Sequence, residues 1–347
     1  MELAALTARL HQRIDLEDQE IEAAANALAS ADVGDEPKAE FLTALAHKGE
    51  TPGEVAAFAR AFRDRAIDPQ VSEWAVRGID VVGTGGDRTG TFNISTATLF
   101  VVAAAGVPVL KHGNRSITSK CGSADFLEAL GVKIDAPAAV QRRALAELGL
   151  CFFFAPAYHP AFKQVAGVRR TLATRGQRTI FNLLGPLINP ARPAHQLLGV
   201  FAASWVQPLA GALERIGLAA AAVVHGEIEP GRGVDELTSV TVNHVAGSGR
   251  LRGWGGRWER GKFGLAAGTW DHLLGGDVQD NLAIFRALLA GRGPASLEDT
   301  IVLNAAVALF VAQRVSSVEA GVELARSLLL GGAVEAKLAA TREFYLS

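Results

Sequence analysis

Residues 79–96 read IDVVGTGGDRTGTFNIST. The apolar run Ile79–Val82 predicts a short strand, which ends in the glycine-rich turn Gly83–Asp87. Glycines after a strand allow the backbone to approach an anion and direct N–H groups at it. The TFNIST segment that follows can cap a helix over 95–105, and a helix N-terminus also binds anions. Each element alone is also explained as an ordinary turn or cap, but two within fifteen residues favour a phosphate site.

Outward from this stretch, strand-like runs alternate with helical patterns. The expected strands are Val107–Leu110, Cys151–Phe154, Leu197–Phe201 and Ala221–Val224. This alternation predicts an α/β fold with a mostly parallel sheet covered by helices. Residues 2–66 have apolar residues at helical spacing and no strand pattern. We therefore predict a small helical domain over 1–70, with part of 159–190 returning to it, and an α/β domain over 75–347.

Composition limits the classes of function. The 347 residues carry 34 basic and 36 acidic side chains, a formal net charge of −2, without the basic excess of a nucleic-acid-binding surface. Two cysteines, in no CxxC pair, do not form a disulfide scaffold. The apolar stretch from Leu99 to Leu110 is interrupted by Gly106 and Pro108 and is too short to span a bilayer. With no signal-peptide pattern at the start, we expect a cytoplasmic protein that binds neither nucleic acid nor membrane.

Two further motifs carry chemistry. A dense run of hydrogen-bond donors, 111–119, comes directly after an expected strand, where ligands bind in open α/β sheets. Asp235 and Glu236 follow the expected strand Ala221–Val224 and a glycine-containing loop. Adjacent carboxylates are common on surfaces, but carboxylates with diphosphate oxygens and water are also what Mg²⁺ prefers.

The ordered set of motifs resembles the anthranilate phosphoribosyltransferase family. The set is GTGGD at 83–87, TFNIST at 91–96, KHGNRSITSKCGSADFLEALG at 111–131, FAPAYHPAFKQVAGVRR at 154–170, FNLLGPLINP at 181–190 and VDE at 234–236. The resemblance implies a helical domain beside an α/β domain of the nucleoside phosphorylase and phosphoribosyltransferase type, and a homodimer formed through the helices. It also implies transfer of 5-phosphoribosyl from 5-phosphoribosyl 1-diphosphate (PRPP) to the amine of anthranilate, with Mg²⁺, in tryptophan biosynthesis.

The resemblance also implies roles for individual residues. The donor would be held by Gly83, Gly86, Asp87, Thr91, Asn93, Ile94, Ser95, Thr96, Lys111, His112, Gly113, Asn114, Arg115, Ser116, Ile117, Thr118, Ser119 and Ser123. Mg²⁺ would be held by Ser95, Asp235 and Glu236, and anthranilate by Gly83, Asn114 and Arg169. His112 and His159 are candidate proton acceptors, although ring packing explains each of them equally well.

The chain departs from the family pattern at three places. The segments TLATRGQR at 171–178 and EIEPGRGV at 227–234 are longer than usual, and Ile188 stands where threonine is expected. Two alternative functions stay open at this point: a nucleoside phosphorylase of similar fold, and a non-catalytic paralogue that binds nucleic acid or a phosphorylated metabolite. The absence of a basic excess argues against nucleic acid, and the intact Asp235–Glu236 pair argues against lost catalysis.

Overall fold

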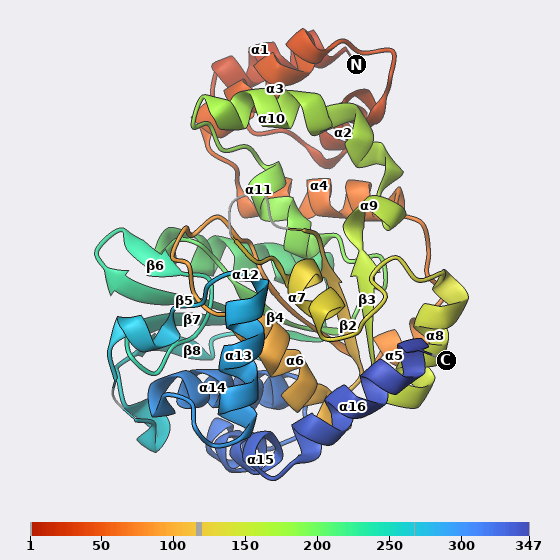
Figure 1. Cartoon of the computed structure of the whole chain (residues 1–347). Helices are drawn as coiled ribbons and strands as arrows, with labels where there is room; N and C mark the ends of the chain where they lie inside the picture. Colours follow the sequence, from red (N-terminus) through yellow and green to blue (C-terminus); the bar gives the residue numbers. More distant parts are fainter. Residues whose placement is uncertain (1, 116–119, 267, 347) are drawn as a thin grey trace.

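The computed structural model describes residues 2–115, 120–266 and 268–346. Four helices at the N-terminal end pack together: α1 (Leu3–His11), α2 (Asp18–Ala29), α3 (Asp35–Lys48) and α4 (Pro52–Asp64). Their apolar faces form one core, which includes Leu6, Phe41 and Phe58. The later segment of η1 (Pro160–Val165), α10 (Ala166–Thr174), α11 (Phe181–Leu184) and η2 (Gly185–Leu187) contributes to the same core, and Figure 1 shows α10 lying along α3.

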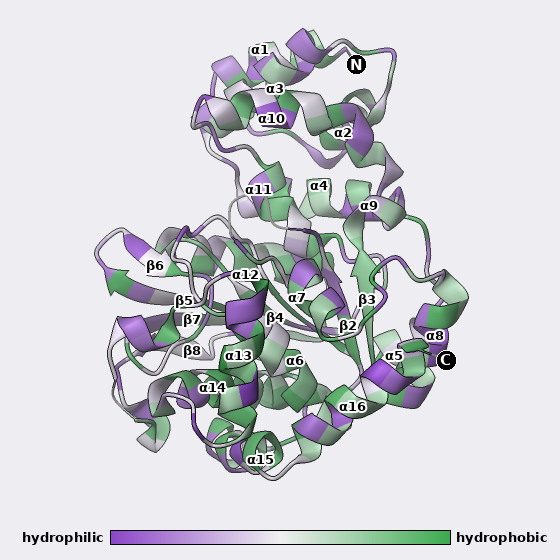
Figure 2. Ribbon diagram, in the orientation of Figure 1, coloured by the Kyte–Doolittle hydropathy of each residue, from purple (hydrophilic) through white to green (hydrophobic). Residues whose placement is uncertain are grey.

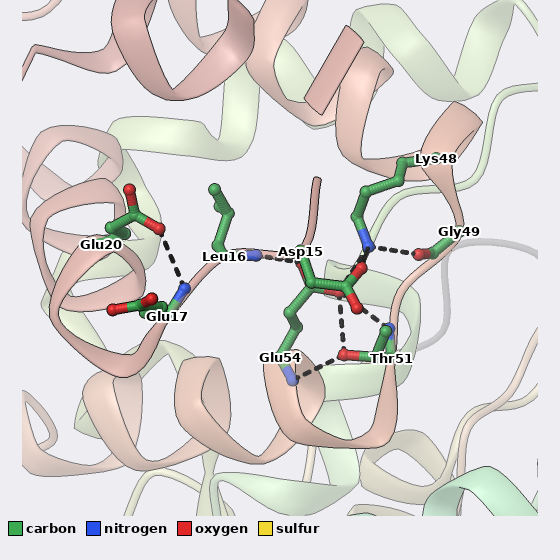
Figure 3. Close-up of polar contacts among 8 residues, drawn as sticks. All are labelled: Asp15, Leu16, Glu17, Glu20, Lys48, Gly49, Thr51 and Glu54. Atoms are coloured by element: carbon green, nitrogen blue, oxygen red, sulfur yellow. Dashed lines mark hydrogen bonds and ion pairs between the residues drawn. The ribbon is translucent and has the colours of Figure 1, made fainter. Parts of the chain in front are cut away.

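A buried polar cluster joins the loops of this helical part (Figure 3). Glu54, only 1% exposed, accepts hydrogen bonds from the Leu16 amide at 3.0 Å and from the Thr51 amide at 2.9 Å. Thr51 in turn caps α4 by accepting from the Glu54 amide at 3.2 Å, which completes a capping box. The Lys48 ammonium lies 2.8 Å from Glu54 and 2.6 Å from Asp15. The cluster thereby fastens the α1–α2 and α3–α4 connections to one carboxylate.

The rest of the chain is built on an eight-stranded sheet with the order β3-β2-β1-β4-β5-β7-β8. The bounds are β1 (Ile79–Gly83), β2 (Val109–Gly113), β3 (Leu150–Phe154), β4 (His195–Gly199), β5 (Ala220–Glu229), β6 (Arg232–Val234), β7 (Val242–Gly249) and β8 (Gly255–Trp258). The first five in that order are parallel, whereas β7 and β8 are antiparallel and β6 pairs with β5 as a hairpin. The predicted mostly parallel sheet is confirmed.

Helices cover both faces of the sheet. One face packs against α6 (Ile94–Ala104) and α14 (Ala295–Val311), and the other packs against α12 (Val206–Ile216). The helices α15 (Val318–Leu330) and α16 (Ala333–Leu346) pack in turn on α6 and α14 as an outer layer. Alternate residues of β4 enter the two cores: Leu197 belongs to the core formed with α6 and α14, and Leu198 belongs to the core that includes α12. Figure 2 shows α6 and the central strands mostly in hydrophobic colours, as this double burial requires.

The remaining helices lie around the edges of the sheet. They are α5 (Ser72–Ala75), α7 (Ser123–Ala129), α8 (Ala138–Leu148), α9 (Ala155–Tyr158), α13 (Val278–Leu289) and the short turns η3 (Ala203–Trp205), η4 (Lys262–Gly264) and η5 (Trp270–Leu273). None of the helices in the described part of the chain combines the length and the apolar character that crossing a membrane requires.

Two strand predictions are wrong in detail. The second strand, expected over Val107–Leu110, continues through Gly113 as β2, so that Lys111 and His112 lie in the sheet and not in the loop after it. The pairing of Lys111 with Phe152 of β3 supplies the ladder partners for this extension. Strands β6, β7 and β8 are absent from the predicted set, because their glycines are poor strand formers.

Candidate active site

The carboxyl ends of β1, β2 and β4 meet at one edge of the sheet, and the predicted site residues gather there. Gly83 ends β1, and the glycine turn leads from it towards α6. Asp235 and Glu236 come directly after the hairpin strand β6. The Gly85 amide donates to Oδ2 of Asp235 at 2.6 Å, and the Ser95 amide donates to Oε1 of Glu236 at 3.1 Å. The three predicted metal ligands, Ser95, Asp235 and Glu236, are therefore brought together although 141 positions separate the serine from the glutamate.

Glycine is required where Asp235 lies against the strand ends. A Cβ on Gly83 would overlap the Asp235 carboxylate, and a Cβ on Gly199 would overlap the Asp235 carbonyl. Any side chain at either position would push Asp235 away from the turn. The apolar strands thus end in glycines because Asp235 occupies the adjacent space.

Three carboxylates repel one another at this edge. Burial raises the pKa of Asp235 well above its usual range, and the charges of Asp87 and Glu236 raise it further. Burial likewise raises the pKa of Glu236 to about 7, although the positive charge of Lys111 opposes the shift. Buried carboxylates with raised pKa values are stabilised by a cation, and hard oxygen ligands suit Mg²⁺. Within the described residues, no three His, Cys, Asp or Glu side chains make a closed metal site, so a cation here would take further ligands from a substrate or water.

Lys111 lies behind the carboxylates, inside the sheet. Its side chain is buried, and its Nζ donates to the Val81 carbonyl at 2.6 Å. Burial lowers the pKa of Lys111, while the charges of Asp80, Glu236 and Asp235 oppose that shift. The ammonium is therefore a counter-charge to these carboxylates from the protein side.

Sequence reasoning missed two residues that support this arrangement. Asp80, fully buried in β1, accepts a 2.8 Å hydrogen bond from Asn189, which also donates to the Leu110 carbonyl at 2.7 Å. Burial raises the pKa of Asp80 to about 6, and the charge of Lys111 opposes it. A charged residue inside the apolar run IDVV was the signal that could have identified Asp80.

The predicted donor residues around α6 differ in orientation. Asn93 occupies the N-cap position of α6 but makes no side-chain cap bond; its amide donates instead to the Cys121 carbonyl at 3.4 Å. Ile94 and Thr96 are both fully buried in the core, so only their backbone groups are available to a ligand. Thr91 forms an isolated bridge with Leu274. The expectation that side chains cap this helix is wrong. The Ile94 amide donates to the Phe92 carbonyl at 2.8 Å and the Ser95 amide to Glu236. Among the described residues, only the Thr96 amide of the first turn is therefore left without an acceptor and can bind an anion.

The loop after β2 carries the next donor candidates. Asn114 is exposed, and its Oδ1 accepts from the Arg115 amide at 2.8 Å. Arg115 forms ion pairs with Asp125 at 2.7 Å and Glu128 at 2.9 Å, both on α7. Ser123 begins α7 beside Gly113. The predicted residues Ser116, Ile117, Thr118 and Ser119 lie outside the described residues.

The turn itself contributes Gly86 and Asp87. Gly86 has a φ of +78°, which glycine adopts without strain. The Asp87 carboxylate accepts from the Thr89 hydroxyl at 2.7 Å. Within the part of the chain that is described, the amides of Gly86 and Asp87 donate to no protein group, so the turn offers unpaired N–H groups beside the carboxylates.

A second group of predicted residues surrounds aromatic rings at the boundary with the helical part. The guanidinium of Arg169 on α10 lies 5.1 Å from the Phe181 ring and 5.9 Å from the Phe162 ring, and burial lowers its pKa. Among the described residues, Arg169 forms no ion pair, whereas a carboxylate would be a natural partner for a half-buried guanidinium. The His159 ring packs edge-on at 5.5 Å from Phe162.

His112 and His159 form a buried pair with ring centroids 5.0 Å apart. Nε2 of His112 and both ring nitrogens of His159 have no hydrogen-bond partner among the described residues. Burial is the main cause that lowers the pKa of His112 to about 3, and the neighbouring His159 contributes a smaller shift in the same direction. Burial lowers the pKa of His159 to about 4. Both rings are therefore neutral at pH 7.

Comparison with known proteins identifies the class first. The chain matches the family models described as "Glycosyl transferase family, helical bundle domain" over residues 4–66 and "Glycosyl transferase family, a/b domain" over 76–335. Fold and site thus define a glycosyltransferase with a helical bundle and an α/β part. The anthranilate phosphoribosyltransferases of Deinococcus radiodurans and Moorella thermoacetica are 42% and 45% identical to it, covering 96% and 87% of this chain and 96% and 86% of their own. The chain belongs to the anthranilate phosphoribosyltransferase family.

Solved structures agree with this assignment. The anthranilate phosphoribosyltransferase from Thermus thermophilus has a TM-score of 0.89 and 40% identity over 99% of both chains. The enzyme from Saccharomyces cerevisiae in complex with PRPP and Mg shares the fold, with a TM-score of 0.83 and 23% identity over 99% of this chain and 98% of its own. The predicted family and activity are confirmed: the chain transfers the phosphoribosyl group to anthranilate. The two alternatives, a nucleoside phosphorylase and a non-catalytic paralogue, are thereby set aside.

Proposed function

We propose that the carboxyl edge of the sheet holds PRPP with Mg²⁺ and that Arg169 holds anthranilate. One observation carries the donor assignment: the Gly85 and Ser95 amides hold Asp235 and Glu236 beside a glycine turn in which, among the described residues, the Gly86 and Asp87 amides have no protein acceptor. The unpaired amides suit diphosphate oxygens, and Mg²⁺ held by the carboxylates would relieve their mutual repulsion. The complex of the Saccharomyces cerevisiae enzyme with PRPP and Mg supports this proposal.

In this arrangement the protein stabilises the leaving group. As the bond from ribose C1 to diphosphate breaks, the sugar gains oxocarbenium-like character and the diphosphate accumulates negative charge. Mg²⁺ held by Ser95, Asp235 and Glu236 would neutralise part of that charge. The amides of Gly86, Asp87 and Thr96, which have no acceptor among the described residues, would direct their partial positive charge at the diphosphate. The buried Lys111 ammonium would add a positive charge on the protein side of the site. This is electrostatic catalysis at the position where charge develops.

The acceptor needs positioning more than activation. The amine of anthranilate is neutral at pH 7, so its lone pair is available without a base. The carboxylate ortho to that amine suits the Arg169 guanidinium, which has no protein carboxylate partner among the described residues, and Gly83 and Asn114 would lie at the junction with the donor. His112 and His159 stay candidate proton acceptors after attack, with low pKa values that make them weak bases. Holding both substrates in line would supply much of the rate.

We further propose that residues 1–70, with part of 159–190, act as a helical domain through which a cytoplasmic homodimer forms. The packing of α10 and α11 against α3 and α4 and the separate family models over residues 4–66 and 76–335 support the domain division. Sedimentation of the wild-type chain at several concentrations tests the dimer.

A carboxylate variant tests the donor site. We expect Asp235→Ala/Glu236→Ala to lose most activity and Mg²⁺-dependent PRPP binding while its circular dichroism stays that of the wild type. Glu229→Ala/Glu259→Ala removes two exposed carboxylates and the same charge, and should stay active. The assay is a mass-resolved reaction with PRPP, Mg²⁺ and a panel of aromatic amines. Full activity of the first variant with the metal chelated would refute the metal assignment.

A further inference from the structure

Arg178 connects the segment that carries the acceptor residues to the glycine turn. It lies between α10, which carries Arg169, and α11. Its Nη2 donates to the carbonyl of Gly86 at 3.0 Å, and its guanidinium stacks 3.7 Å from the centroid of the Phe201 ring. Arg178 belongs to the extended segment 171–178, and neither the sequence motifs nor the proposed mechanism assigns it a role.

Phe201 is itself tied to the turn. Its amide donates to Oγ1 of Thr84 at 3.1 Å, and the Thr84 amide donates to the Gly199 carbonyl at 3.0 Å. The glycine turn is therefore held at three consecutive residues: Thr84 by the end of β4, Gly85 by Asp235, and Gly86 by Arg178. Arg178 is the contact that comes from the helical part of the molecule.

The bond to Gly86 determines the direction of the next amide. In a trans peptide, the C=O and the following N–H point in opposite directions because the unit is planar. With its carbonyl directed at Arg178, the Gly86–Asp87 peptide turns the Asp87 N–H away from Arg178. That N–H has no acceptor within the described residues. Rotation of this peptide would replace an N–H donor by a carbonyl oxygen, which repels an anion.

The groups around Arg178 favour a hydrogen bond from its guanidinium to the Gly86 carbonyl over an ion pair. Arg178 is an exposed residue whose guanidinium is partly covered, and this partial burial lowers its pKa. The charge of Arg88 acts in the same direction, and the charge of Asp87 opposes both. Arg178 forms no ion pair with a carboxylate in the described residues, so its fixed partners are a carbonyl and a ring. Stacking on Phe201 limits the guanidinium to one plane and aligns its N–H with Gly86.

We propose that Arg178 is a positioning residue that fixes the Gly86–Asp87 peptide so that its N–H faces the diphosphate of PRPP. This inference rests on the proposed donor site. It also makes donor binding depend on the segment that carries Arg169, so that the donor turn is ordered when the helical part lies in its place.

The test is a kinetic comparison of four variants with the wild type. We expect Arg178→Ala to raise the KM for PRPP about tenfold, as for loss of a charge-assisted hydrogen bond, with the KM for anthranilate little changed. Arg178→Lys keeps one donor and the charge and should recover part of the PRPP affinity. Phe201→Leu keeps the backbone bond to Thr84 and should raise the KM for PRPP less than Arg178→Ala. Arg175→Ala removes an exposed charge of the same segment and should behave as the wild type.

Three outcomes would overturn the role of Arg178: an unchanged KM for PRPP in Arg178→Ala with only a lower melting temperature, a rise confined to the KM for anthranilate, or an equal effect of Arg175→Ala. If Arg178→Ala does not fold, Arg178→Lys and Phe201→Leu decide by the same criteria. Failure of the donor site itself would show separately, as retained PRPP binding in Asp235→Ala/Glu236→Ala.

Discussion

The main-chain amide of Gly85 donates a 2.6 Å hydrogen bond to Oδ2 of Asp235, a residue 150 positions further along the chain. This bond holds a carboxylate of the proposed metal site against the turn that we propose binds the donor. The same carboxylate fills the space in which Gly83 would carry a side chain. The turn and the carboxylate therefore form one unit, and moving either should affect the binding of both PRPP and Mg²⁺.

Gly83→Ala should abolish most activity without unfolding the protein. The added methyl group would overlap the Asp235 carboxylate, which must move away from the metal position. We expect a higher Mg²⁺ requirement and a lower kcat, measured by titrating Mg²⁺ at saturating PRPP. Gly53→Ala, whose methyl group would meet only ordinary van der Waals contact, is the control. Wild-type Mg²⁺ dependence in Gly83→Ala would contradict the placement of Asp235.

Arg169→Ala should weaken the binding of anthranilate and leave the binding of PRPP unchanged. The guanidinium of Arg169 lies among Phe162 and Phe181, whereas its neighbour Arg170 is exposed. We expect the KM for anthranilate to rise roughly tenfold or more, the loss of a bidentate charge-assisted contact, with the KM for PRPP little changed. Arg170→Ala is the matched control. Equal effects of the two substitutions would leave the acceptor site unassigned.

His159→Phe should reduce the loss of stability at acidic pH. Burial lowers the folded-state pKa of His159 from 6.5 to about 4, so the unfolded chain binds the proton first as the pH falls. Stability contributed by the neutral ring is therefore complete above pH 6.5 and decreases towards pH 4, by about 1.4 kcal/mol per pH unit. Urea unfolding at about pH 7, 6 and 5 should show a shallower decline for the variant.

The comparison must be made against the wild type at each pH. The raised pKa values of Asp80 and Glu236 act in the opposite direction, because these buried carboxyls retain protons that the unfolded chain releases. Subtraction removes this shared contribution. His47→Gln, which removes an exposed imidazole, provides the control. Parallel curves for His159→Phe and the wild type would show that burial does not hold the His159 ring neutral in the folded state.

Glu54→Gln should destabilise the helical part. The Glu54 carboxylate and the Lys48 side chain are almost fully buried, and removing the Glu54 charge leaves Lys48 with only Asp15, whose side chain is 65% exposed, as a carboxylate partner. The expected cost is on the order of 3 kcal/mol in the free energy of unfolding by urea. Glu36→Gln, at an exposed position on α3, should change it by less than about 0.5 kcal/mol. A similar small change for Glu54→Gln would mean that the amide satisfies the cluster as well as the carboxylate does.

Local pattern was sufficient to predict the strand, turn and helix of residues 79–96, because each feature depends on neighbours in sequence. It failed at Lys111 and His112, which polarity placed in a loop. The strand continues because Phe152 and Phe153 of β3 pair with these residues and the Val81 carbonyl accepts from Lys111. Those partners belong to other strands and cannot be read from the segment itself.

In the site, too, local motifs predicted some residues, whereas others depend on contacts between distant segments. The motifs predicted a set of donor and metal residues, of which the structure brings Ser95, Asp235 and Glu236 together. The crowding of Asp87 with Asp235, the buried Asp80 and the contact of Arg178 with Gly86 depend on approach between distant segments. Arg178 in particular carried no motif, since its contacts are one carbonyl and one ring that meet it only in the folded state.

The three contacts of the glycine turn also set an order for assembly during synthesis. The turn leaves the ribosome before any of its partners, Arg178, Phe201 and Asp235, has been translated. At ordinary elongation rates the 150 residues between Gly85 and Asp235 take about 8–30 s to add. During that interval the nascent chain can fold its N-terminal helices and pair β1 with β2. A chain arrested before Asp235 would therefore emerge with a helical bundle and part of a sheet, but without the carboxylate that holds the turn we propose for PRPP.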